Sequence, residues 1–363
     1  MGAAVARELA SRGAQLVLLT QHSITDPFLS DYIFDLRAET NNELITAEQV
    51  DLASLHSIRL FATKWIDNAP PRRLDLIVLC ANTMTPRGAA VQVSEDGVEA
   101  NFAINYLANF HLLSILSPAI RAQPADRDVR VLVGACSSYM AGRIPDVVPI
   151  PRIRGSKSAG KGNSKNGGTA ANPAAYASSK LALMTFASAF QKHLSSYQRP
   201  DKAPVNARVI MVDPGYTRTP GMRRYITFGS LWGLGLYLLT WPFWWLVLKS
   251  PVQGAQTFLM AAMEAEYGRG EGGMLLKECM EYKVVKDEVY DEEAQKRLWE
   301  ISEKAIEALE KEGAVRRAVE KKEREQREKE EKVTEVVEPM AEKPAKNEGN
   351  EKTPASRRAR KKA

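Results

Sequence analysis

The sequence predicts an α/β protein built on a doubly wound parallel sheet. Short, continuously apolar runs alternate with longer segments of helical periodicity, which is typical of parallel strands joined by helical crossovers. Strands with one solvent-exposed face alternate apolar and polar residues, and the apolar runs here show no such alternation. We therefore expect helices on both faces of the sheet. A chain of 363 residues exceeds a typical domain of ~100–200 residues, and one α/β core with appendages fits it best.

The expected elements begin near the N-terminus. A helix over residues 3–12 ends at Gly13, and the apolar run 15–19 after it suits a buried strand. A second helix-strand unit is expected to follow, with its helix over residues 57–65 and its strand over residues 74–80. Further helices are expected over residues 98–116 and 176–194, and further strands over residues 129–135 and 205–212.

Composition separates a core, expected over residues 1–285, from its appendages. Within the core, residues 154–172 are rich in Gly, Ser and Lys and predict a flexible insertion. Residues 286–335 are highly charged with helical spacing, and we expect a docked helix that continues as a solvated one. One face of it carries Leu298, Ile301, Ile306 and Leu309. Residues 336–363 predict a disordered basic tail.

Charge and cysteine usage exclude several classes of protein. The formal net charge is only +6, and much of it lies in the tail, where no aromatic residues interleave the basic ones. We therefore expect no specific nucleic-acid binding and favour a solvated end over contact with anionic lipid. The three cysteines and four histidines have no disulfide or metal-ligand spacing, so we expect a reduced compartment and no metal site. The N-terminus lacks a signal peptide.

Residues 225–248 contain no charged side chain and four tryptophans, and Arg223, Arg224 and Lys249 bracket them. The length could cross hydrocarbon of ~30 Å, which takes ~20 residues. Pro242 and several glycines argue against one uninterrupted helix, and clustered tryptophan suits a lipid-water interface. We expect contact with a membrane or lipid surface, spanning or lying on it. A greasy lid folded onto the protein is the alternative.

Tyr176 and Lys180 are four positions apart on a predicted helix, which puts them on one face. A nearby cation lowers the pKa of a phenol, whose ordinary value of ~10 is too high for a general acid or base at neutral pH. Ser137 and Ser138 end the preceding apolar strand, at the edge where doubly wound sheets place ligands. A hydroxyl there can hold a substrate oxygen, or it can simply end the strand.

With these residues in this order, the chain resembles the short-chain dehydrogenase/reductase family, over about residues 1–305. The match extends to the helix around Asn105, and the retinol-dehydrogenase-like branch with its fungal lipid-droplet relatives is the most similar. The resemblance implies that Tyr176 is the general acid/base, that Lys180 assists it and binds ribose, that Ser138 positions the substrate, and that Asn105 completes a proton relay. It also implies NADP or NAD as cofactor, with NADP slightly favoured.

The resemblance also implies a cofactor-binding set. The loop after the fourth strand would clasp the nicotinamide amide and the diphosphate, and other residues would line the adenosine half. With Asn105, Tyr176 and Lys180, the set is Gly2, Gln21, Asp51, Leu52, Ala81, Pro214, Gly215, Thr217 and Thr219. Gln21 can hydrogen-bond either cofactor, so the preference stays open.

Two departures from the family pattern concern the cofactor. The family opens with a strand and a glycine-rich turn that cradles the diphosphate, and of these Gly2 alone matches. We favour a natural start upstream of Met1; a degenerate copy is the alternative. The second departure is Leu79-Cys80-Ala81-Asn82, where the family usually has N-N-A-G, and Cys80 cannot supply the amide hydrogen bonds of asparagine.

The sequence thus predicts an NAD(P)-dependent oxidoreductase that interconverts an alcohol and a carbonyl on a lipophilic substrate of the retinoid, steroid or fatty-aldehyde class. The expected location is the cytoplasmic face of the endoplasmic reticulum or a lipid droplet, and a homodimer is possible. The alternative is a membrane-tethered, non-catalytic scaffold that keeps the fold.

Overall fold

A computed structural model describes residues 1–86, 89–150, 172 and 174–337. The chain forms two compact units, Met1–Lys311 and Glu312–Ala363. The predicted insertion, apart from Asn172, and the predicted tail from residue 338 onward lie outside the described residues.

The strands form two sheets rather than the single one predicted. The first sheet pairs β1 (Leu16–Thr20) in parallel with β2 (Ile45–Gln49). The second has the order β3-β4-β5-β6-β7 and is parallel except for its last pair. Its strands are β3 (Leu76–Leu79), β4 (Val129–Gly134), β5 (Ala207–Asp213), β6 (Leu275–Lys277) and β7 (Met280–Tyr282). Among the described residues no strand pairs with both sheets.

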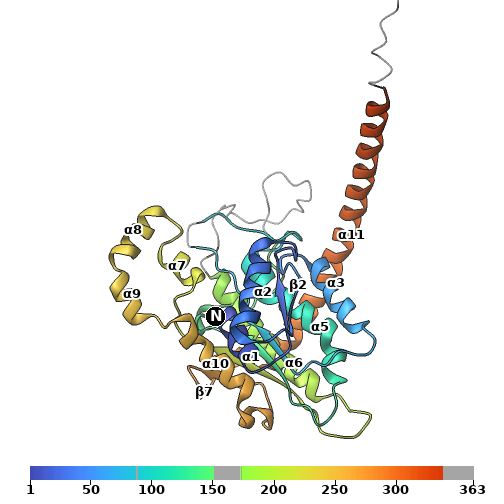
Figure 1. Ribbon diagram of the computed structural model, residues 1–363. Helices are drawn as coiled ribbons and strands as arrows, with labels where there is room; N and C mark the ends of the chain where they lie inside the picture. Colours follow the sequence, from blue (N-terminus) through green and yellow to red (C-terminus); the bar gives the residue numbers. More distant parts are fainter. Residues whose placement is uncertain (87–88, 151–171, 173, 338–363) are drawn as a thin grey trace, which may run out of the picture. The chain divides into compact units, whose positions relative to one another are not determined.

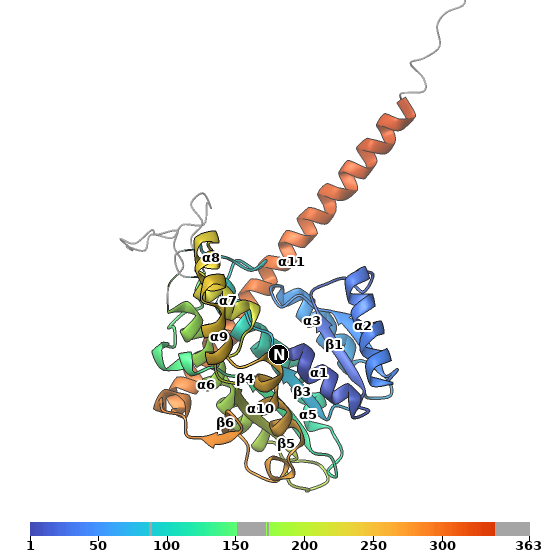
Figure 2. The same cartoon turned by 60° about the vertical axis from the view of Figure 1, so that its left-hand side comes forward.

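Helices cover both faces of the larger sheet. Successive side chains of a strand point to opposite faces, so Val131 and Val133 of β4 pack into one core while Leu132 packs into the other. The first core also holds α3 (Leu55–Ile66), α5 (Ala108–Arg121), α6 (Ala175–Ser195) and the first part of α11 (Glu292–Val337). The second holds α1 (Gly2–Ser11) and α10 (Pro251–Met263), which lie side by side (Figure 1, Figure 2). The doubly wound α/β fold predicted from the sequence is confirmed.

The prediction missed α2 (Pro27–Thr40) and β2. Leu36 is the one buried side chain of α2, and Tyr32 and Ile33 pack beside it at helical spacing. Phe28 and Phe34 are largely exposed and obscure this apolar stripe in the sequence. Asp26 caps the helix by accepting from Phe28 N, ahead of Pro27 in the first turn, so capping and periodicity both mark α2.

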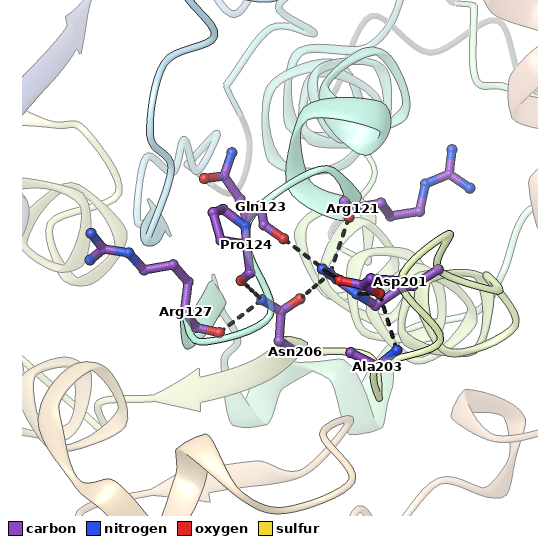
Figure 3. Close-up of polar contacts among 8 residues, drawn as sticks. Arg121, Gln123, Pro124, Arg127, Asp201, Ala203 and Asn206 are labelled. Carbon is purple, nitrogen blue, oxygen red and sulfur yellow. Dashed lines mark hydrogen bonds and ion pairs between the residues drawn. The ribbon is translucent and has the colours of Figure 1, made fainter.

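A polar network fixes the turns that enter β4 and β5, at the amino ends of these strands (Figure 3). Asn206 Nδ2 donates to Pro124 O at 2.7 Å and to Arg127 O at 2.8 Å. Arg199 donates to Gln123 O at 3.0 Å and is paired with Asp201, whose pKa it lowers to about 2. The network lies at the edge opposite to the carboxyl ends of the strands, and it stabilises the turns that lead into β4 and β5.

Three short helices follow β5, and they project away from the sheet (Figure 1). They are α7 (Pro220–Ile226), α8 (Leu231–Leu239) and α9 (Trp241–Val247), so the apolar segment 225–248 is divided at residues 227–230 and at Thr240. Neither α8 nor α9 is long enough to cross a hydrocarbon core. Among the described residues one helical stretch, Ala100–Arg121, has the length and composition of a membrane span, and 72% of its window is buried inside the protein.

Candidate active site

The predicted catalytic residues come from three elements at the carboxyl ends of the strands. Tyr176 and Lys180 lie in the first turns of α6, and Ser138 lies just after β4. Asn105 lies in a π-helical turn, Ala103–Leu107, that interrupts the helix between α4 (Ala100–Phe102) and α5. Such a turn widens a helix by one residue and often marks a functional position.

Tyr176 is half-buried, and its hydroxyl accepts a hydrogen bond from Asn82 Nδ2 at 3.3 Å. Burial is the main cause that raises the pKa of Tyr176 well above its usual value, and the Cys136 thiol and the Asp213 carboxylate raise it further. The hydrogen bond from Asn82 lowers it. Without a bound cation the phenol therefore stays protonated at neutral pH.

Lys180 is 3% exposed, and its ammonium lies 5.9 Å from the centre of the Tyr176 ring. Its Nζ donates to Gly134 O, at the end of β4, at 2.9 Å. Burial lowers the pKa of Lys180 from 10.5 to about 8, against the attraction of Cys136 and Asp213. The ammonium is therefore buried at a desolvation cost beside the phenol, and the spacing of the two residues predicts this proximity. The predicted lowering of the phenol's pKa by Lys180 is not seen, because burial, Cys136 and Asp213 raise that pKa.

Replacing Lys180 by methionine is expected to stabilise the fold while it removes the cation from the site. Below pH 8 the lysine is protonated in both states, and the folded state bears the cost of a buried charge. That cost falls as the pH rises from about 8 toward 10.5, because the folded state then loses its proton first. We expect a gain on the order of 2 kcal/mol in the free energy of unfolding at pH 7 and a smaller gain at pH 10.

Urea unfolding at the two pH values measures this difference. Lys192→Met on the same helix is the matched control, because Lys192 is 48% exposed and pairs with Glu292. It should change the free energy of unfolding by less than about 0.5 kcal/mol. A Lys180→Met variant that is less stable than the parent at pH 7 would contradict the prediction.

Ser138 Oγ is buried and has no hydrogen-bond partner among the described residues. Its neighbour Ser137 instead donates to Asp213 Oδ2 at 2.5 Å and so ties the end of β4 to the end of β5. A buried hydroxyl without a partner is costly, and such a group favours an incoming acceptor or donor. The two serines thus differ: the Ser137 hydroxyl stabilises the fold by its hydrogen bond to Asp213, and the Ser138 hydroxyl can still bind a ligand.

Asn105 is completely buried, and its amide is fully used. Its Oδ1 accepts from Thr83 N at 2.8 Å, and its Nδ2 donates to Thr83 O at 2.9 Å and to Ser179 Oγ at 3.1 Å. Ser179 Oγ in turn donates to Tyr176 O at 2.8 Å. Asn105 therefore joins the loop after β3 to the first turn of α6.

The loop after β5 carries the residues expected to clasp the cofactor. Asp213 Oδ1 accepts from Gly215 N at 2.9 Å, and Gly215 has a φ of +74° that favours glycine. Thr217 is buried, and its hydroxyl donates to Gly215 O at 3.2 Å. Thr219 caps α7 by accepting from Met222 N at 3.2 Å. Pro214 is buried within the same turn.

The residues at the opposite end of the site fit a dinucleotide in part. α1 begins at Gly2, and helix N-termini attract phosphate. A Cβ on Gly2 would lie 2.8 Å from Cys80 Sγ, so glycine is needed for this close approach. Ala81, the residue after Cys80, is exposed. With the Ser138 hydroxyl, which has no partner among the described residues, these features suit the nicotinamide half and one phosphate contact.

Gln21, Asp51 and Leu52 lie at the carboxyl ends of the smaller sheet. Gln21 follows β1 and is exposed, and its backbone oxygen accepts from Gln49 Nε2 at 3.4 Å. Asp51 Oδ1 accepts from Ala53 N at 2.8 Å, which shapes the turn after β2. No hydrogen bond or ion pair among the described residues joins these three to Tyr176 or Lys180, although Leu52 packs against the core that also holds α6.

Three residues that contact or influence the phenol of Tyr176 were not predicted to do so from the sequence. Asp213 acts on Tyr176 through space, Cys136 acts both through space and through a side-chain hydrogen bond, and Asn82 acts through a hydrogen bond. A signal for Asn82 was present, since it stands where the family usually has glycine. For Cys136 and Asp213 the position after buried strands was the available hint.

No family model matches the chain, but individual proteins do. An uncharacterized oxidoreductase of Schizosaccharomyces pombe is 42% identical over 316 residues, covering 86% of this chain and 80% of the relative. Retinol dehydrogenase 13 of Mus musculus is 31% identical over 313 residues, covering 84% and 80%. Among solved structures, an actinorhodin polyketide ketoreductase with NADPH aligns with a TM-score of 0.52 at 15% identity, covering 77% and 91%. By these relatives and this fold, the chain belongs to the short-chain dehydrogenase/reductase family of NAD(P)-dependent oxidoreductases, in its retinol-dehydrogenase-like branch.

Proposed function

We propose that the protein interconverts an alcohol and a carbonyl on a lipophilic substrate, with Tyr176 as general acid/base. The observation that carries the proposal is the group at the carboxyl ends of the strands: a half-buried phenol, the buried ammonium of Lys180 beside it, and the unpartnered hydroxyl of Ser138. A protonated phenol donates to a carbonyl oxygen, and a phenolate removes the proton of an alcohol.

The proton and the electrons balance in either direction. In oxidation, the alcohol gives its hydroxyl proton to Tyr176 and a hydride, with both electrons of a C–H bond, to the oxidised nicotinamide. In reduction, Tyr176 would give its proton to the carbonyl oxygen, and the reduced nicotinamide would give the hydride to the carbonyl carbon. The bound dinucleotide, for which we favour NADP over NAD, supplies the hydride acceptor or donor and a positive charge that lowers the pKa of the phenol. Thr217, Thr219 and Gly2 would hold it, and Ser138 would orient the substrate oxygen.

The lipophilic substrate class rests on an apolar surface next to the cofactor loop. The segment that follows Thr219 exposes large apolar side chains over α8 and α9, and we call them the α8–α9 surface. They are Leu231, Trp232, Leu236, Leu238, Leu239, Phe243, Trp245, Leu246 and Val247, each more than half exposed. Relatives named retinol dehydrogenase and polyprenol dehydrogenase support the same class.

Turnover of matched aldehydes tests the proposal. Purified protein is mixed with NADPH or NADH and with all-trans-retinal, dodecanal or butanal, and the loss of nucleotide absorbance is followed. We expect kcat/KM to be at least tenfold higher for dodecanal than for butanal, because eight more methylene groups become buried at about 0.8 kcal/mol each, minus the cost of ordering them. Equal values would contradict the lipophilic class. If the protein neither binds nor turns over a nucleotide, that result would favour the non-catalytic scaffold.

We also propose that the α8–α9 surface inserts into the cytoplasmic leaflet of an endoplasmic reticulum or lipid-droplet surface. An apolar patch of this extent on a monomer indicates a binding surface, and tryptophan favours the lipid-water interface. Arg223 and Arg224, exposed in the last turn of α7, add attraction to anionic headgroups. The helices lie on the surface in this proposal, since neither is long enough to span.

A vesicle flotation assay distinguishes this surface from other exposed apolar residues. Trp232→Asp combined with Leu239→Asp should lower partitioning onto vesicles of phosphatidylcholine with one-fifth phosphatidylserine by more than tenfold, because each buried side chain contributes about 1.5–3 kcal/mol. Phe28→Asp combined with Phe34→Asp is the matched control, since both residues are exposed apolar side chains of α2. Equal flotation of the two double variants would rule out insertion through α8 and α9.

A further inference from the structure

The loop after β3 places an amide donor on the phenol of the active site. Asn82 Nδ2 donates to Tyr176 Oη at 3.3 Å. At this position the family pattern has glycine, which carries no side chain. The donor is therefore supplied by the sequence of this chain, and the roles carried over from the family do not include it.

Two buried asparagines hold the backbone that follows Asn82. Asn105 binds both the N–H and the C=O of Thr83, at 2.8 and 2.9 Å. Asn101, 2% exposed, accepts from Thr85 N at 3.0 Å and donates to Thr85 Oγ1 at 3.1 Å. These hydrogen bonds fix the backbone at Thr83 and Thr85, one and three residues after Asn82. The Cα of Asn82 therefore has a defined position, and its exposed side chain extends from there toward Tyr176.

The other neighbours of the phenol oppose its ionisation. Burial, the Cys136 thiol and the Asp213 carboxylate all raise the pKa of Tyr176. Lys180 Nζ is directed to Gly134 O, and it is 5.9 Å from the centre of the phenol ring. Cys136 also hydrogen-bonds the phenol, but its contact raises the pKa, whereas the amide of Asn82 donates to the phenol oxygen and lowers it. A donor favours the charged form of the phenol.

We propose that Asn82 is a further catalytic residue, which donates to the phenolate of Tyr176 and stabilises it during alcohol oxidation. The amide N–H keeps its proton throughout, and the proton of the alcohol goes to the phenolate oxygen. A charge-assisted hydrogen bond is roughly twice as strong as a neutral one, so the contact gains strength when the phenol ionises. The inference rests on the proposed function, because it needs Tyr176 as the base.

The pH dependence of kcat for oxidation of dodecan-1-ol with NADP⁺ is the first test. Asn82→Ala and Asn82→Gly remove the donor and should move the rising limb of the profile up by about one pH unit. Asn82→Asp should move it further, because a carboxylate opposes a neighbouring phenolate. Met84→Ala, in the same loop, is the control, since methionine offers no donor, and its profile should match the parent. An unshifted profile in Asn82→Ala, or an equal shift in Met84→Ala, overturns the proposal.

A second readout does not depend on turnover. With tyrosine labelled at the ring carbon that bears the hydroxyl, the carbon NMR signal of Tyr176 is identified by its loss in Tyr176→Phe. In Asn82→Ala that signal should move at pH 8, while in Met84→Ala it should stay in place. A signal that stays in place in both overturns the role of Asn82. If instead Tyr176→Phe keeps full turnover, the proposed function fails, whatever the signal does.

Discussion

Replacing Tyr176 by phenylalanine is expected to lower kcat for retinal and dodecanal by about 10²–10⁴-fold, the usual contribution of general acid/base catalysis. The ring remains, so packing in the first turn of α6 should persist, and the change is confined to the hydroxyl that accepts from Asn82 and is proposed to meet the substrate oxygen. Binding of NADPH should change little, because the ring and Lys180 still line the site.

Steady-state rates with NADPH, set beside nucleotide fluorescence titration and circular dichroism, measure this change. Tyr282→Phe in β7 is the matched control: Tyr282 is 48% exposed and loses the same hydroxyl far along the sequence from the site. Its kcat should stay within twofold of the parent. A Tyr176→Phe variant with more than a tenth of the parent rate would remove Tyr176 from the mechanism.

Replacing Phe186 by alanine is expected to lower the free energy of unfolding by about 3–5 kcal/mol, as for other fully buried aromatic residues. Phe186 of α6 is 2% exposed and lies in an aromatic cluster. Ring-centre distances from Phe186 are 4.9 Å to Phe110, 5.5 Å to Phe190, 5.7 Å to Trp299 and 6.2 Å to Tyr106. The cavity would open where α5, α6 and α11 meet, and this loss is a large part of a typical stability of 5–15 kcal/mol.

Urea unfolding followed by tryptophan fluorescence measures this loss. Phe186→Leu fills most of the volume and should cost clearly less than Phe186→Ala. Phe34→Ala, at a site 72% exposed, should change the free energy by less than about 0.5 kcal/mol. A loss in Phe186→Ala no greater than in Phe34→Ala would show that the cluster does not hold α11 to the core.

The sequence by itself determined the class of fold and the placement of Tyr176 and Lys180 on one helix. Continuous apolar runs predicted β1, β3, β4 and β5 within two residues of their observed bounds, because buried parallel strands leave no polar alternation. The four-residue spacing of Tyr176 and Lys180 placed both in the first turns of one helix. These features depend on local periodicity, which a sequence carries in full.

The tertiary structure alone decided how distant polar residues meet. Asn82 and Tyr176 are 94 positions apart, and the contact forms because Asn105 and Asn101 fix the intervening loop. Likewise, Ser137 and Ser138 look alike in sequence, yet Asp213 accepts from the first, and the second has no partner among the residues that the structure describes. The division into two sheets depends on which strands become neighbours, and the local sequence pattern does not carry that information. Long-range hydrogen bonds and burial set these choices, and neither leaves a periodic trace along the chain.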